Sequence, residues 1–193
     1  TSNDVNNYKL GTYIMIMDDA FGGSVTIPDE TQVVPPANLT EIGWEDFDGA
    51  ELGKTYSTEW EKFTYKDTNA TTLNNTRFTG QIQFAENSGI RFGGSSEWFG
   101  LHVFVVNGKL GFKSDTFTLS DLNATEFEAS QFGITSGTFA DAEFKLTITM
   151  TNVTETTATV GVWVNDIAAD ESFTMTSNDV NNYKLGTYIM IMD

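Results

Sequence analysis

The chain has 193 residues and carries 27 acidic side chains against 10 lysines and arginines, so its formal net charge is −17. This charge argues against nucleic acid and anionic membranes as partners, because both would repel the protein. The sequence contains no cysteine and one histidine, His102, which excludes disulfides, cysteine-ligated metals and multi-histidine sites.

The first predicted element belongs to a repeat. Residues 1–18, TSNDVNNYKLGTYIMIMD, recur without change as residues 176–193, an offset of 175 residues. Self-similarity at a fixed period is the signature of an array of structural units. We therefore interpret the chain as one 175-residue period plus an 18-residue overlap, taken from a tandem array. An engineered copy of the N-terminal segment at the C-terminus is the alternative.

The repeated segment contains a strand that is apolar on both faces. Its residues are Tyr13, Ile14, Met15, Ile16 and Met17 in the first copy, and Tyr188, Ile189, Met190, Ile191 and Met192 in the second. Such a strand must be covered on both faces and would promote aggregation on an open edge. Because two copies cannot fill one position in one sandwich, we expect one to complete its own unit and the other to join a neighbouring unit by strand addition. Alternatively, residues 1–27 fold back onto the same domain and one copy lies on the outside.

A domain boundary is predicted at residues 28–37, where Pro35 and Pro36 favour a stiff, extended connection. The predicted parts are the closing strands of a preceding or neighbouring unit (1–27), a proline-containing linker (28–37) and a sandwich (38–193). After the first copy of the repeat, the chain continues through a further predicted strand, 23–27. The sandwich is therefore expected to lack its last strand, which a neighbour must supply.

The rest of the chain shows the two-residue alternation and β-rich runs of strands, with almost no helical periodicity. Strands are predicted at residues 11–17, 23–27, 58–66, 77–84, 89–93, 98–106, 109–113, 143–151, 157–165, 171–175 and 185–192. Asn107-Gly108 predicts a type I′ hairpin, and a second hairpin is predicted between 144–150 and 157–164. Many short strands, glycine-rich turns and 15 phenylalanines predict an all-β, two-sheet antiparallel sandwich.

Residues 78–112, FTGQIQFAENSGIRFGGSSEWFGLHVFVVNGKLGF, resemble the central strands of laminin G-like, concanavalin A-type jelly rolls. In that family a strand ending in Gly-Ile-Arg-Phe-Gly-Gly precedes a Trp-Gly strand and an Asn-Gly hairpin. Residues 132–150, 157–166 and 8–27 continue the resemblance in the family's order. It implies a two-sheet antiparallel jelly-roll sandwich of the kind found in tandem repeats of large microbial surface proteins. Such domains commonly bind glycans or proteins, or act as spacers.

Residues 41–46, EIGWED, resemble the catalytic strand of retaining β-glucanases in the same superfamily, in which a Glu, an Asp and a second Glu alternate on one strand face. Glu41 and Glu45 would share a face, but Gly43 stands where the middle Asp belongs. Because this acid is missing, we expect no catalytic function. A β-glucan hydrolase is the less favoured alternative.

Three further groups of residues are candidate sites. Glycosylation sequons (Asn-X-Ser/Thr) occur at Asn38, Asn69, Asn74, Asn123 and Asn152, mostly in predicted turns or loops. Trp98, in a Gly/Ser-rich segment, is the best candidate for stacking against a sugar ring. Four acidic groups could bind Ca²⁺ through oxygen ligands; they are Asp18-Asp19, Asp29-Glu30, Glu45-Asp46-Asp48 and Asp170-Glu171.

The leading hypothesis is a structural, non-catalytic protein of the extracellular space or cell surface, a filament or array whose units are joined by strand sharing or donation. Its partners would be copies of itself in a homopolymer or tandem array, with glycans as further partners. The alternative is a lectin-like adhesin module that binds carbohydrate or protein. No cofactor is expected apart from Ca²⁺. No apolar stretch reaches the length of a transmembrane helix, so no membrane insertion is expected either.

Overall fold

The computed structural model describes residues 38–56, 61–67, 73–92, 101–114, 127–140, 142–154, 157–176 and 188–192. The chain divides into two units, Thr1–Gln32 and Val33–Asp193, and all of the described residues belong to the second unit. The predicted strands 11–17 and 23–27 and the predicted linker 28–37 lie outside the described residues. Their roles therefore stay predictions.

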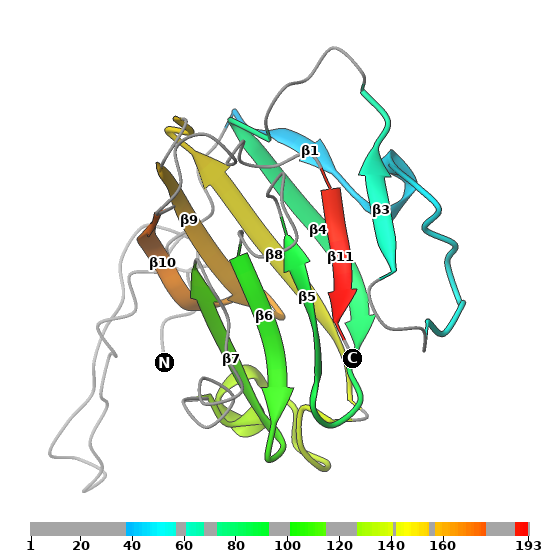
Figure 1. The fold of residues 1–193 in the computed structure, drawn as a ribbon. Coiled ribbons are helices and arrows are strands. Elements are labelled where there is room, and N and C mark those ends of the chain that lie inside the picture. Colours follow the sequence, from blue (N-terminus) through cyan, green and yellow to red (C-terminus); the bar gives the residue numbers. More distant parts are fainter. Residues whose placement is uncertain are drawn as a thin grey trace, which may run out of the picture. The chain divides into compact units, whose positions relative to one another are not determined.

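The described part of the chain is mostly β-structure (Figure 1). Its strands are β1 (Thr40–Ile42), β2 (Phe47–Asp48), β3 (Lys62–Tyr65), β4 (Thr76–Gln83), β5 (Ser88–Phe92), β6 (Leu101–Val106), β7 (Lys109–Ser114), β8 (Glu143–Thr151), β9 (Thr157–Val164), β10 (Ile167–Thr176) and β11 (Tyr188–Met192). Two short 3-10 helices, η2 (Trp44–Asp46) and η4 (Ala129–Phe132), complete it. These ranges contain no α-helix, and hence no helix able to cross a membrane.

The strands form two sheets. The first sheet has five strands in the order β1-β4-β8-β9-β10. The second consists of a two-stranded part, β2-β3, and a three-stranded part, β5-β6-β7, joined by β11 into the order β2-β3-β11-β5-β6-β7. Both sheets are open, since each ends in two edge strands. The first sheet is mixed because β1 runs parallel to β4, so the prediction of purely antiparallel pairing is wrong at this edge.

The predicted hairpins are confirmed. Asn107 and Gly108 both have positive φ angles, 53° and 71°, as a type I′ turn between β6 and β7 requires. The Glu86 carboxylate accepts hydrogen bonds from the backbone amides of both Asn107 and Gly108. The Gly108 amide nitrogen lies 2.9 Å from the accepting carboxylate oxygen. The second predicted hairpin joins β8 and β9 in antiparallel register. Local turn chemistry thus sets the register of β6 and β7.

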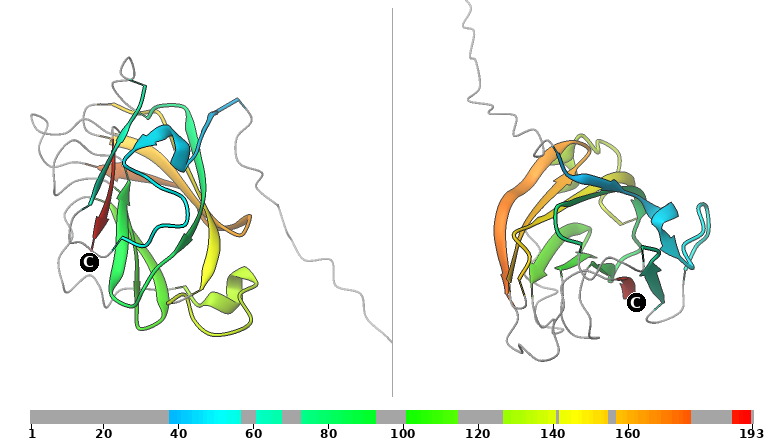
Figure 2. Two further views of the ribbon diagram at one scale, coloured as in Figure 1. Left: turned by 90° about the vertical axis from the view of Figure 1, so that its right-hand side faces the viewer. Right: turned by 90° about the horizontal axis from the view of Figure 1, so that it is seen from above.

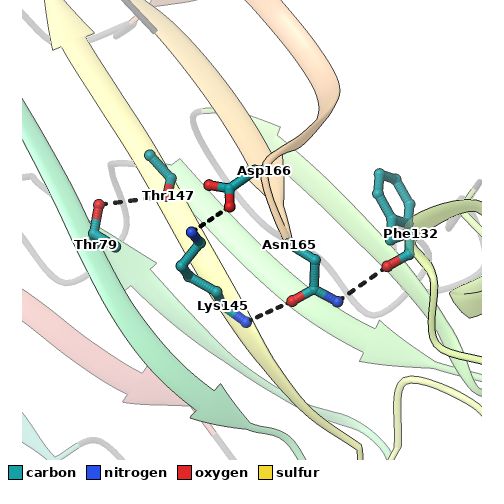
Figure 3. Close-up of polar contacts among 6 residues, drawn as sticks. All are labelled: Thr79, Phe132, Lys145, Thr147, Asn165 and Asp166. Atoms are coloured by element: carbon teal, nitrogen blue, oxygen red, sulfur yellow. Dashed lines mark hydrogen bonds and ion pairs between the residues drawn. The ribbon is translucent and has the colours of Figure 1, made fainter. Parts of the chain in front are cut away.

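A third hairpin, between β9 and β10, turns on Asn165 and Asp166, whose φ angles are 49° and 66°. Figure 3 shows how its side chains secure the surrounding loops. The Asn165 amide accepts a hydrogen bond from the Lys145 backbone at 2.9 Å and donates one to the Phe132 carbonyl at 3.0 Å. Asp166 forms an ion pair with the Lys145 ammonium group. This turn therefore holds η4 against the end of the first sheet.

The hydrophobic core lies between the two sheets, whose layers can be followed in Figure 2. Alternate residues of β5, β6 and β8 belong to it. The centroid of the Phe78 ring in β4 lies 5.1 Å from the centroid of the Phe92 ring in β5 and 6.2 Å from that of the Phe47 ring in β2. Aromatic packing across the layers thus joins the two sheets.

Gly89 in β5 lies opposite Phe104 of β6. A Cβ atom at residue 89 would lie 2.8 Å from the Phe104 Cα and still closer to the Val103 carbonyl oxygen. Because these are backbone atoms of a central strand, displacing them would disturb the pairing of β6 and would cost free energy. Gly89→Ala is expected to lower the free energy of unfolding by about 1–3 kcal/mol in urea titrations. Gly80→Ala, whose new methyl group would meet side-chain atoms of Trp44 and Phe78, is the comparison and should cost less.

Candidate functional site

The second copy of the repeated strand, β11, occupies the interior of the second sheet (Figure 1). It runs antiparallel to both of its neighbours, β3 and β5. Ile189 and Met190 each have a register partner in β3 and another in β5, so the backbone of β11 is hydrogen-bonded along both edges. We call this position, between Lys62–Tyr65 and Ser88–Phe92, the β3–β5 slot.

The walls of the slot belong to the core. The register places Ile189 between Phe63 of β3 and Phe92 of β5, and Ile191 opposite Ile90 of β5. Phe63, Ile90 and Phe92 are all buried in the core cluster. Emptying the slot would separate the second sheet into its two parts and expose two rows of backbone groups. The repeated strand is therefore an integral part of the unit that contains it.

The structure thus places Tyr188, Ile189, Met190, Ile191 and Met192 in a sheet built by the rest of the second unit. The first copy, Tyr13, Ile14, Met15, Ile16 and Met17, lies outside the described residues. Its predicted role between units stays a prediction. Sequence reasoning identified the strand but missed the residues that receive it, because nothing local marks two strands as its neighbours.

No protein family model, no curated protein and no solved structure matches this chain. Any function must therefore be inferred from its own residues and their arrangement.

A row of basic residues crosses the outer face of the second sheet. Lys62, Arg91, His102 and Lys113 share one register row over β3, β5, β6 and β7, with Met190 of β11 between the first two. Arg91 and His102 are only 1% exposed, although their strand neighbours point into the core on the other face. All four of these residues take part in interactions within the protein. Arg91 and His102 are therefore packed residues of the fold, whereas Lys62 at the end of the row is exposed.

The predicted acidic pair is separated by the structure. Glu41 lies in β1, which ends at Ile42, whereas Glu45 lies in η2. The expectation that both share one strand face is therefore wrong, because the chain turns at Gly43. The Glu41 carboxylate accepts a hydrogen bond from the Arg77 Nε at 2.6 Å, which raises the pKa of the Arg77 guanidinium group. This ion pair joins β1 to β4 at the edge of the first sheet.

Other acidic residues also have local roles. Asp46 accepts a hydrogen bond from the Gly43 amide at 2.8 Å and so closes the start of the 3-10 helix. Asp170, in β10, accepts one from the Ser172 amide at 3.0 Å. Within the described ranges no three acidic or histidine side chains converge as metal ligands. The predicted pairs Asp18-Asp19 and Asp29-Glu30 lie outside those ranges, so the proposal of a Ca²⁺ site there is untested.

Three of the five sequon asparagines, Asn38, Asn74 and Asn152, are described, and all three are exposed. Asn38 and Asn152 have positive φ angles of 78° and 51°, which fits turns. The Asn74 side-chain oxygen accepts a hydrogen bond from the Val153 amide at 3.1 Å. Asn69, Asn123 and the candidate sugar contact Trp98 lie outside the described residues, and their roles stay predictions.

Proposed function

We propose that this protein is a structural, non-catalytic component of an extracellular filament or surface array, built from 175-residue β-sandwich units in tandem. The observation that carries the proposal is the mismatch between strands and places. The chain holds two identical copies of a strand for which the described sheets offer one interior position. A surplus copy of a core strand is what a segment of a repeating array contains.

The arrangement of the unit supports concatenation. The copy that fills the β3–β5 slot follows all other strands of its unit along the chain, so it leaves room for another unit to follow. The described edge strands are β1, β2, β7 and β10, and two of them are only two or three residues long. An apolar strand added at such a short edge would gain few hydrogen bonds and would leave one face in water. This favours the slot of a unit over the edges at β1 and β2 as the place for the first copy.

The finer fold assignment is part of the proposal. The chain crosses repeatedly between layers, from β4 in the first sheet to β5–β7 in the second, then to β8–β10 in the first and to β11 in the second. Such crossing between two packed sheets is typical of jelly rolls and supports a concanavalin A-like jelly roll. Exposed sequons and a net charge of −17 support an extracellular or cell-surface location.

The test is electron microscopy of chains that carry one, two and three periods. Each added period is expected to lengthen the particle by roughly 40 Å, the diameter of a compact chain of this size. Native material should show the same axial repeat. A two-period chain that is no longer than a one-period chain would contradict the proposal.

A further inference from the structure

We infer that the β3–β5 slot accepts either flanking copy of the repeated strand, and that residues 13–17 of the same chain can replace residues 188–192 in it. This inference rests on the proposed array and identifies the site at which strands would be shared. In an array, a unit closed by its upstream copy would borrow the last strand of the preceding unit.

The fit follows from sequence identity. Every residue of the repeated segment is the same in both copies, so each contact made within the slot can be made by either. In the observed register Ile189 lies opposite Phe63 and Phe92, and the equivalent residue of the first copy is Ile14. The contacts inside the slot therefore cannot discriminate between the copies. Only the chain that connects each copy to the unit can do so.

Both connections are long enough. The downstream copy is joined to β10 by the eleven residues 177–187, and the upstream copy would be joined to β1 by the 22 residues 18–39. Twenty-two extended residues span about 70 Å, more than the diameter of a compact domain of this size. Doubling the length of a flexible loop disfavours its closure by about a factor of three. From the entropy of loop closure alone, the downstream copy is expected to fill the slot about three times as often as the upstream copy.

A copy from another molecule is a weaker competitor in dilute solution. A tethered segment has an effective concentration in the millimolar range, far above the micromolar concentration of a second chain. Exchange requires β11 to leave the interior of a sheet, which is a sub-global opening and therefore slow. The two closures should consequently coexist as separable populations once the protein has folded.

The absence of cysteine allows a direct test in the full chain. Thr64 is exposed and is the register partner of Tyr188. A chain with Thr64→Cys, Tyr13→Cys and Tyr188→Cys is refolded and oxidised, so that residue 64 forms a disulfide with one of two competing partners. Peptide mass mapping is expected to find 64–188 and 64–13 bonds in a ratio of about three to one, both in monomers. No 64–13 bond, or one found only in covalent dimers, would overturn the inference.

Proline variants of the same three-cysteine chain provide matched controls. Met190→Pro removes a backbone donor from the downstream copy and should shift the bond almost completely to 64–13. Met15→Pro does the same to the upstream copy and should leave only 64–188. A Met190→Pro chain without a 64–13 bond would overturn the inference, whether or not it folds. Multi-period chains that still form rods would then leave the proposed function standing.

Discussion

A chain carrying both Met15→Pro and Met190→Pro is expected to lose about 3 kcal/mol or more of its free energy of unfolding. Residue 190 lies in the centre of the second sheet and is paired with β3 on one side and β5 on the other. Proline there removes a ladder hydrogen bond, whichever neighbour accepts it. With both copies altered, no intact strand is left for the slot.

Each single proline variant, in contrast, is expected to lose less than about 1 kcal/mol, because the other copy can still fill the slot. The effects of the two substitutions should therefore be strongly non-additive. Urea unfolding followed by circular dichroism at low protein concentration measures all three variants, and the double Met→Leu variant, which keeps both backbone donors, is the control. If Met190→Pro alone lost as much as the double variant, β11 would be essential and its twin unable to replace it.

Phe78→Ala is expected to lower the free energy of unfolding by about 3–5 kcal/mol. Phe78 is completely buried, and its ring makes an edge contact with Trp44 at 5.2 Å as well as the contacts with Phe47 and Phe92. Truncation would leave a cavity where β4 of the first sheet meets β2 and β5 of the second. The surrounding rings come from three elements and cannot collapse together into the space.

The matched control is Leu52→Ala, because Leu52 is 79% exposed and should change stability by less than about 0.5 kcal/mol. Chemical denaturation with an unchanged slope would show that the loss lies in the folded state. A loss below about 1 kcal/mol for Phe78→Ala would mean that the two sheets do not share one packed core.

Local pattern was enough to place most strands. The predicted segments 77–84, 143–151 and 157–165 match β4, β8 and β9 to within one residue at each end. They could be predicted because residue types alternate along β4 and β8, and because β9 is a continuous run rich in β-branched residues. The strands β1 and β2 were missed because runs of two or three residues are too short to show a period. Glu41 and Glu45 were misplaced for the same reason, since the strand expected to hold both ends at Ile42.

The sequence by itself determined the β-class of the protein, the hairpin at Asn107-Gly108 and the presence of two identical apolar segments. Each of these depends on neighbouring residues or on direct comparison of segments. Only the tertiary structure decided that β11 lies between β3 and β5, and that Arg91 and His102 fall in one row. Pairing between distant strands depends on how both faces pack and on closing long loops, and neither leaves a mark in a short window of sequence.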